Sequence, residues 1–128
     1  MKAELAFVLG TLVGSTVAIG VVTAAESESD PVKLSPQMYD VRFENDRVRV
    51  LEYRAKPGQK EPMHSHPPGV VYSFTDSVMR VTLPDGSTSE TPRKAGDLTW
   101  RDFTTHAAEN TGATEAHALA VELKPCRN

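Results

Sequence analysis

The chain has 128 residues, of which 39% are hydrophobic and 24% charged, with a formal net charge of -3 at neutral pH. A chain of this length holds one domain, because a second hydrophobic core would need more residues. Acidic and basic residues are interleaved without a basic stripe, which excludes nucleic acid as an expected partner. The single cysteine, Cys126, cannot form an internal disulfide, and we expect it to be an exposed thiol.

The first 25 residues have the pattern of a targeting segment. Residues 5–22 are apolar or small, Lys2 precedes them, and residues 23–25 are small enough for signal peptidase. The run is long for a signal-peptide core and close to the short limit for a membrane span. We expect a signal peptide over 1–25 or an uncleaved membrane anchor over 5–22. Both imply an exported domain, periplasmic or secreted, and only the anchor implies contact with a membrane.

The expected organisation then continues with a solvated linker over 26–37, a folded domain over 38–124 and a tail over 125–128. In the folded part, short alternating runs are separated by turn residues at intervals of roughly 8–12 residues, as in antiparallel β proteins. We expect eight or nine strands, at residues 39–43, 47–54, 63–66, 70–74, 78–83, 87–91, 98–101, 106–110 and 116–123. No stretch has a helical apolar period long enough for a core helix. The pattern predicts an all-β fold, a sandwich, a jelly roll or a small barrel.

His64 and His66 carry the clearest chemical signal. Residues two apart on a strand point to the same face, so both imidazoles project together. Two neutral imidazole nitrogens on one face can bind one metal ion at about 2.0–2.1 Å. On its own, however, a His-x-His pattern is equally typical of a surface pair on an edge strand.

The spacing around these histidines resembles the two sequence motifs of the cupin superfamily. Gly58, five residues and then His64-Ser65-His66 match the first motif, and Gly96 followed by His106 and Asn110 matches both ends of the second. The resemblance covers residues 42–124 and is greatest to small single-domain cupins, some of which are associated with β-alanine degradation. It implies a single cupin β-barrel, also called a jelly roll or double-stranded β-helix, and a homodimer.

The same resemblance implies that three histidines, His64, His66 and His106, hold one divalent transition metal, namely Fe, Zn, Cu, Ni or Co. Two departures from the cupin pattern affect this expectation. The glutamate that completes the ligand set in related cupins falls at Val70 or Val71, and valine cannot ligate a metal. The second motif lacks its Pro-x-Gly turn and is one residue short, which we expect to change only a loop.

A neutral three-His face is similar to that of cysteine dioxygenase and acetylacetone dioxygenase, and it leaves metal positions open for a small molecule. The resemblance therefore implies a metal-dependent, dioxygenase-like enzyme that acts on a small anionic ligand. The alternative is a non-catalytic module that binds or senses a metal or small ligand. No catalytic residue is assigned.

Other side chains are weaker candidates. The pocket candidates, each equally typical of plain core, are Tyr53, Met63, Val71, Tyr72 and Trp100. We expect His117 to be packed or to support a ligand rather than to bind metal. We expect Glu61 on a turn and not as a ligand. Asn110 is expected to satisfy backbone groups at a turn. Four arginines could anchor a carboxylate, but we favour solvent-facing strand positions for them: Arg49, Arg54, Arg80 and Arg101.

Overall fold

The computed structural model describes residues 28–126 and contains one short helix and nine strands in that part of the chain. The elements are α1 (Pro31–Leu34), β1 (Tyr39–Glu44), β2 (Val48–Ala55), β3 (Lys60–His66), β4 (Gly69–Ser73), β5 (Ser77–Thr82), β6 (Thr88–Arg93), β7 (Leu98–Arg101), β8 (Thr104–Asn110) and β9 (Ala116–Leu123). The all-β prediction is confirmed. Most strand ends lie within two residues of the expected positions, and β3 differs most, because it begins at Lys60 rather than Met63.

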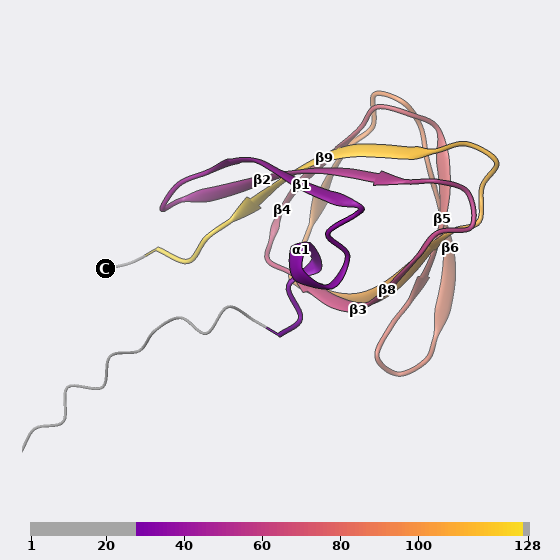
Figure 1. Ribbon diagram of the computed structural model, residues 1–128, viewed down its shortest axis with the longest axis horizontal. Helices are drawn as coiled ribbons and strands as arrows, with labels where there is room; N and C mark the ends of the chain where they lie inside the picture. Colours follow the sequence, from indigo (N-terminus) through magenta and orange to yellow (C-terminus); the bar gives the residue numbers. More distant parts are fainter. Residues whose placement is uncertain (1–27, 127–128) are drawn as a thin grey trace, which may run out of the picture.

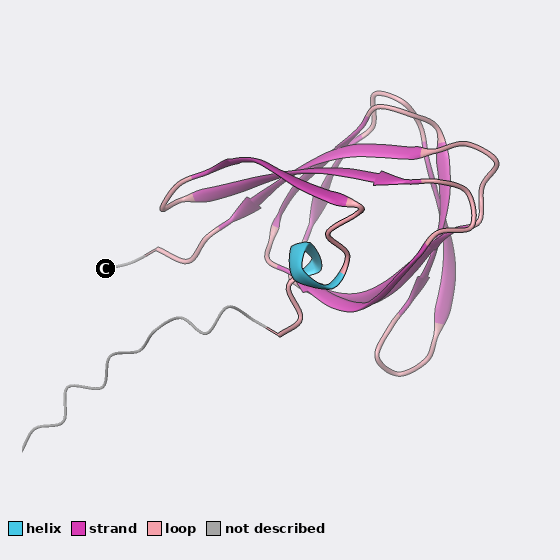
Figure 2. Ribbon diagram, in the orientation of Figure 1, coloured by secondary structure: helices cyan, strands magenta, loops and turns pink. Residues whose placement is uncertain are grey.

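The strands form two antiparallel sheets that face each other. One sheet has five strands in the order β1-β2-β9-β4-β7, and the other has four in the order β3-β8-β5-β6. Figure 1 shows β9, β2 and β1 above and β3 and β8 below, and Figure 2 shows strands joined by loops, with one short helix. The result is a jelly-roll barrel, and the space between the sheets is where a site can be enclosed.

Small residues on β9 keep this space open. The inward positions of β9 alternate as Ala116, Ala118, Ala120 and Glu122, opposite Leu51 and its neighbours on β2. The core of buried apolar side chains gathers at one end of these strands and consists of Met38, Tyr39, Leu51, Ala55, Ala116 and Ala120. Because alanine side chains are short, the sheets meet at this core but leave a cavity beside it.

The segment before β1 packs on the barrel. Asp30 caps α1 by accepting a hydrogen bond from the Val32 amide at 3.0 Å, and Pro31 fits the first turn of a helix. Ser29 accepts a hydrogen bond from the Ser65 amide at 2.9 Å, and α1 contacts both β3 and β1 (Figure 1). From Ser29 onward, this segment is part of the folded domain, in contrast to the solvated linker expected over 26–37.

The expected targeting segment over 1–25 lies outside the described residues. Within residues 28–126, no helix is long and apolar enough to cross a membrane. Cys126, the last described residue, is an exposed free thiol, as expected.

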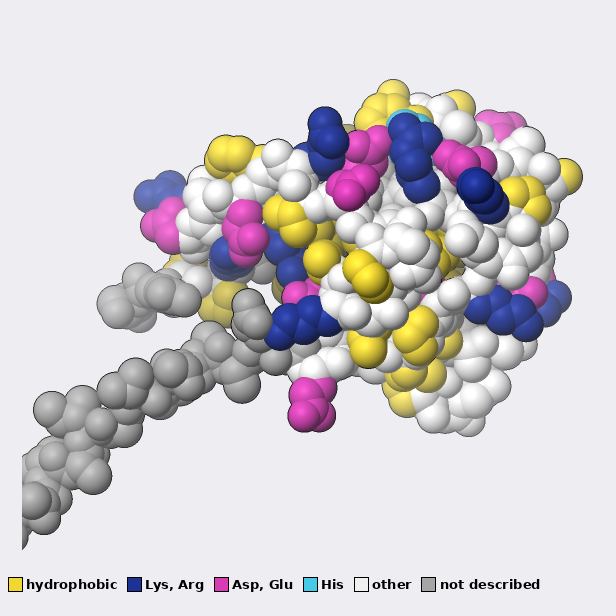
Figure 3. Space-filling view, in the orientation of Figure 1, with side chains coloured by type: hydrophobic (Ala, Val, Ile, Leu, Met, Phe, Trp, Pro, Cys, Tyr) yellow, Lys and Arg dark blue, Asp and Glu magenta, His cyan; other side chains and the backbone are white. Residues whose placement is uncertain are grey.

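The outer surface carries charges of both signs. Figure 3 shows basic and acidic side chains close to one another on the visible face, with apolar atoms between them. Two of the four arginines discussed for the sequence lie on the outer surface, as expected. Arg54 forms ion pairs with Glu52 and Glu115, and Arg80 forms one with Glu90. Such exposed pairs add little stability and mainly keep the surface soluble.

Candidate metal centre

Three histidines from two neighbouring strands meet on the inner face of the four-stranded sheet. His64 and His66 lie two residues apart on β3, and His106 lies directly opposite His64 on the antiparallel strand β8. One nitrogen of each ring lies within 4.8 Å of the other two. His64 and His66 are 1% and 2% exposed, so these polar rings are held away from water. The structure thus brings together the three residues that the sequence singles out.

The hydrogen bonds fix which nitrogen of each β3 histidine carries the proton. Nδ1 of His64 lies 2.7 Å from the Pro62 carbonyl oxygen, and Nδ1 of His66 lies 2.6 Å from a Glu122 carboxylate oxygen. Both acceptors require Nδ1 to be the donor, so in the neutral rings both Nε2 atoms are unprotonated. These two lone pairs face each other at 2.9 Å, and neutral rings cannot form a hydrogen bond there.

A cation placed between the two Nε2 atoms would satisfy both. Adjacent ligands of an octahedral ion with bonds of about 2.0–2.1 Å are separated by roughly 2.9 Å, as these nitrogens are. The buried environment also keeps the rings of His66 and His106 neutral. Burial lowers the pKa of His66 to about 4, and burial followed by the charges of His64 and His66 lowers the pKa of His106 to about 3. The donor set therefore fits a divalent transition metal, because imidazole binds metal in its neutral form.

Glu61 is a buried carboxylate close to the Nε2 atom of His64. It lies on β3 rather than on the expected turn, it is 5% exposed, and one of its oxygens is 3.7 Å from Nε2 of His64. A register shift between Glu61 and His64 marks a bulge, which turns both residues inward although they are three positions apart. The expected turn position of Glu61 is therefore wrong, while the expectation that it is not a ligand stays a prediction. The signal that could have placed it is Pro62, because proline within a strand is typical of a bulge or an edge.

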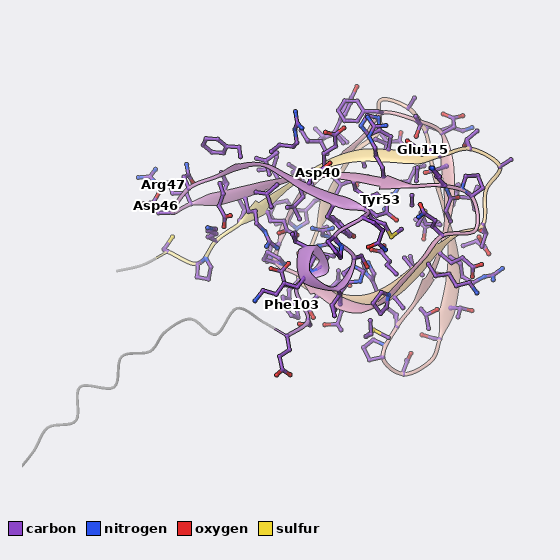
Figure 4. All side chains as sticks on the ribbon, viewed as in Figure 1. Asp40, Asp46, Arg47, Tyr53, Phe103 and Glu115 are labelled. Atoms are coloured by element: carbon purple, nitrogen blue, oxygen red, sulfur yellow. The ribbon has the colours of Figure 1, made fainter. Side chains whose placement is uncertain are left out.

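Two tyrosines hold Glu61 in place. The hydroxyl groups of Tyr39 and Tyr53 donate to its two carboxylate oxygens at 2.7 and 3.2 Å. Burial raises the pKa of Glu61, and burial together with the Glu61 charge raises the pKa of Tyr39 and of Tyr53. Figure 4 shows Tyr53 projecting from β2 into the space between the sheets. These three residues form a polar wall beside the histidines.

Glu122 on β9 is the second buried carboxylate, and sequence reasoning missed it. It is 0% exposed and accepts hydrogen bonds from His66, from Arg101 at 3.1 Å and from Arg49 at 2.8 and 3.0 Å. Burial opposes its ionisation, but the hydrogen bonds from His66 and Arg49 lower its pKa. A carboxylate that orients the second nitrogen of a metal-binding histidine is common in metal sites. Its sequence signal is a glutamate in phase with three inward alanines.

Arg49 and Arg101 are half-buried on the inner face of the five-stranded sheet, not solvent-facing as we expected. They lie in one row of register partners across the five-stranded sheet. In this row Glu122 is opposite Arg49 on one side and opposite Gly69 on the other, and Gly69 is in turn opposite Arg101. Gly69 contributes no side chain, so no group stands between Glu122 and Arg101. A Cβ atom at Gly69 would lie 2.1 Å from the Val121 carbonyl oxygen, so β4 and β9 approach closely here.

A cavity of about 220 Å³ lies between the sheets, next to the histidines. Its polar lining includes His66, His106, Glu61 and Arg101, and its apolar lining includes Val71, Met79, Val81 and Ala118. Two pocket candidates from the sequence, Tyr53 and Val71, line it. Trp100 contributes at the rim and is 57% exposed. Met63 and Tyr72, which are 39% and 40% exposed, do not line it.

Val71, one of the two positions at which the cupin resemblance predicts a glutamate, lies at the wall of this cavity. It lies on the inner face of β4, opposite Ala120 and Thr99. Val70 belongs to the outer face, opposite Val121 and Trp100, and is not a lining residue. Of the two positions considered for the missing glutamate, only Val71 therefore faces the cavity. The ligand set remains neutral there.

His117 and the motif residue Asn110 have structural roles. His117 stacks on Phe74 with ring centroids 4.5 Å apart, and its Nε2 lies 2.8 Å from Glu52, so it is a packed side chain outside the three-His cluster. Asn110 is 0% exposed and donates to the carbonyl oxygens of Ala55 and Thr114 at 2.8 Å each. It satisfies backbone groups at the end of β8, as the sequence predicts.

The fold and the histidine cluster together define a jelly-roll barrel with metal-type ligands on its inner face, which is the architecture of a cupin. Known structures agree. The chain matches a cupin domain from Bordetella pertussis Tohama I with a TM-score of 0.63 and 27% identity, over 69% of this chain and 93% of that one. It also matches an RmlC-like cupin from Methanocaldococcus jannaschii with a TM-score of 0.54 and 15% identity, over 66% and 77% of the two chains.

A third match is a protein with a double-stranded β-helix domain from Klebsiella pneumoniae, with a TM-score of 0.52 and 20% identity, over 76% and 79% of the two chains. No protein-family model matches the sequence, and no curated protein matches it either. The chain therefore has the cupin fold, as its two motifs predict.

Proposed function

We propose that the protein is a metal-dependent enzyme that acts on a small anionic molecule at the site formed by His64, His66 and His106. The observation that carries this proposal is the pair of unprotonated Nε2 atoms 2.9 Å apart, since they call for a cation between them. The resident ion is one divalent transition metal, namely Fe, Zn, Cu, Ni or Co. When bound, such an ion supplies Lewis-acid or redox chemistry.

The residues around the histidines favour an open, positively charged site. Val71 replaces a ligating glutamate, and both oxygens of Glu61 are engaged by tyrosine hydroxyl groups. Three neutral imidazoles leave the charge of a dication for an anionic ligand to balance. The first reaction class we propose is dioxygenase-like oxidation, because the three-His set is similar to that of cysteine dioxygenase. The subfamily that the sequence resembles most is that of the small cupins associated with β-alanine degradation.

A non-catalytic module that binds or senses a metal or small ligand is the second candidate. One observation favours it. The acid–base groups beside the histidines, Glu61 with Tyr39 and Tyr53, are already paired with one another. A site without a free acid or base can bind a ligand without transforming it.

Metal content and ligand exchange test the proposal. We expect natively purified protein to contain about one metal ion per chain, and alanine variants of His64, His66 or His106 to lose it. The matched control is His117→Ala, since His117 lies outside the cluster and should leave metal content unchanged. Protein without metal, or equal loss in the control, contradicts the metal site.

Catalysis needs a second measurement. In Co(II)-loaded protein, azide should shift the visible bands if a metal position is exchangeable. Oxygen consumption with a panel of small acids and thiols then separates an enzyme from a binding module. Bands that shift without any turnover favour the binding module, and bands that stay unchanged contradict both an open site and the enzyme.

Export of the protein is a separate proposal, supported only by the apolar run over 5–22. Mass spectrometry of protein from its native cell decides it. A mature N-terminus near Glu26 indicates a cleaved signal peptide, and full-length protein in the membrane fraction indicates an anchor. Full-length protein in the soluble cytoplasmic fraction contradicts export.

A further inference from the structure

The two arginines that bind Glu122 are unequally satisfied. Arg49 uses Nε and one terminal nitrogen on one Glu122 oxygen, and its other terminal nitrogen lies 3.1 and 2.9 Å from the two Asp30 oxygens. Arg101 has one such bond, at 3.1 Å, to a Glu122 oxygen that His66 already uses. Its buried Nε has no hydrogen-bond partner among the described residues. Arg101 thus has an N–H donor without a partner among the described residues, whereas each nitrogen of the Arg49 guanidinium donates a hydrogen bond.

The unsatisfied arginine is also the one that faces the cavity. Arg101 lines the 220 Å³ cavity together with His66 and His106, whereas Arg49 lies on the opposite side of Glu122, in a surface groove beside Asp30. Because Arg101 and His66 share one Glu122 oxygen, the guanidinium and the metal ligands are fixed relative to each other. The cavity wall is mostly apolar and includes Val71, Val81 and Ala118, and Arg93 lines it as well.

We infer that Arg101 anchors the carboxylate of a short aliphatic acid whose other end meets the three-His site. Arginine presents parallel N–H groups that match a planar carboxylate. The mostly apolar wall suits a hydrocarbon body, and the cavity is smaller than the roughly 300–1,000 Å³ of sites for drug-sized ligands. The neighbouring Glu122 carboxylate disfavours a dianion such as phosphate. This inference rests on the proposed function in that the same site would receive the other end of the acid.

Arg49 provides a matched control for the test. Arg101→Met and Arg49→Met each remove one cation from Glu122, but only the first removes a group that lines the cavity. Butyrate is the probe, with butyramide and inorganic phosphate as comparison ligands, and binding is followed by calorimetry and ligand-observed NMR. We expect Arg101→Met to weaken butyrate binding at least tenfold and Arg49→Met to change it less than threefold. Butyramide and phosphate should bind at least tenfold more weakly than butyrate.

Ala118→Leu is a second variant that leaves the Glu122 network intact. It fills the cavity from β9, so it should also weaken butyrate binding at least tenfold, even if Arg101→Met does not fold. Equal butyrate affinity in Ala118→Leu, equal loss in the two arginine variants, or phosphate bound as tightly as butyrate overturns the inference.

The metal site and the Arg101 anchor can be tested independently of each other. Absence of metal from wild-type protein contradicts the metal site, while butyrate titration of the chelator-treated protein still tests Arg101. Butyrate binding that depends on Arg101 in metal-free protein supports the anchor alone. Metal retention without Arg101-dependent binding supports the metal site and overturns the anchor.

Discussion

Glu122 accepts hydrogen bonds from three side chains of the interior. Its carboxylate neutralises Arg49 and Arg101 and orients His66, all at a side chain with no exposed surface. Removing one partner of a buried ionic group leaves the others uncompensated, and this typically costs about 3–5 kcal/mol. The position therefore couples the stability of the barrel to the geometry of the site.

We expect Glu122→Gln to lower the free energy of unfolding by about 3–5 kcal/mol, measured by urea denaturation. The control is Glu115→Gln, which removes the charge from an exposed pair with Arg54 and should cost less than about 1 kcal/mol. Similar losses in the two variants would show that the buried network does not carry the stability we assign to it.

The histidine pKa values set the direction of a pH dependence. The pKa values of His66 and His106 in the folded protein are about 4 and about 3, below the usual 6.5. As the pH falls through 6.5, the unfolded chain takes up protons that the folded protein does not. The stability that these two neutral histidines contribute is therefore fully present above about pH 6.5. It is lost as the pH falls toward their pKa values in the folded protein, by at most about 1.4 kcal/mol per pH unit for each histidine.

Urea denaturation of metal-free protein between about pH 7 and pH 4 checks this prediction. The free energy of unfolding should fall as the pH falls, and His106→Gln should show a shallower dependence, because one of the two buried histidines is absent. A slope that is the same in His106→Gln would mean that His106 does not contribute to it.

At the scale of the elements, β3 explains which parts of the site the sequence can predict. The two-residue spacing of His64 and His66 is enough to place both on one face, whatever the rest of the fold. Glu61 faces the same way only because of the bulge before His64, and in a regular strand positions 61 and 64 would point to opposite faces. Local spacing predicts the histidines, whereas the bulge depends on pairing with β8.

The arginines show the other limit of sequence reasoning. The strand over 98–101 and the alternation within it are predictable, but which face is inward depends on pairing with β4. The partner of Arg101 and Arg49 is Glu122, 21 and 73 residues away. No local pattern specifies contacts of this separation. The strands could therefore be predicted from turn residues and alternation, while the polar network between the sheets could not.

The contact between β4 and β9 provides a prediction at this scale. A Cβ atom at Gly69 would lie 2.1 Å from the Val121 carbonyl oxygen, which forces the two strands apart. We expect Gly69→Ala to destabilise the protein by about 3 kcal/mol, at the upper end of overpacking effects. Val70→Ala, one residue further on the outer face, should cost no more than about 1.5 kcal/mol. Thermal unfolding of the two variants compares them directly, and equal stability would contradict the close approach.

Over the whole molecule, the outer face of the five-stranded sheet carries a continuous set of apolar side chains. One row of apolar side chains crosses all five strands in register, and it consists of Phe43, Val50, Val121, Val70 and Trp100. A second row continues it on three strands with Leu119, Tyr72 and Leu98. Leu98 is 67% exposed and Trp100 is 57% exposed. Apolar patches of this extent on a soluble protein typically mark an interface.

The homodimer expected from the sequence stays a prediction, and this face gives it a location. Five strands about 4.8 Å apart give a face of roughly 500 Å², the same order as the about 800 Å² per partner that a standard interface buries. The rim carries both signs, since Arg54 pairs with Glu52 at one end and Lys124 pairs with Glu44 at the other. Two copies of the face can therefore oppose each other without a clash of like charges.

Leu98→Glu tests this location. It places a charge within the expected contact, on the edge strand β7, so we expect sedimentation velocity to show a dimer for the wild type and a monomer for this variant. Leu83→Glu is the matched control, because Leu83 is also exposed, at 42%, but follows β5 in the other sheet. It should remain dimeric. A wild-type protein that stays monomeric at tens of micromolar, or dissociation by both variants, would contradict a dimer through this face.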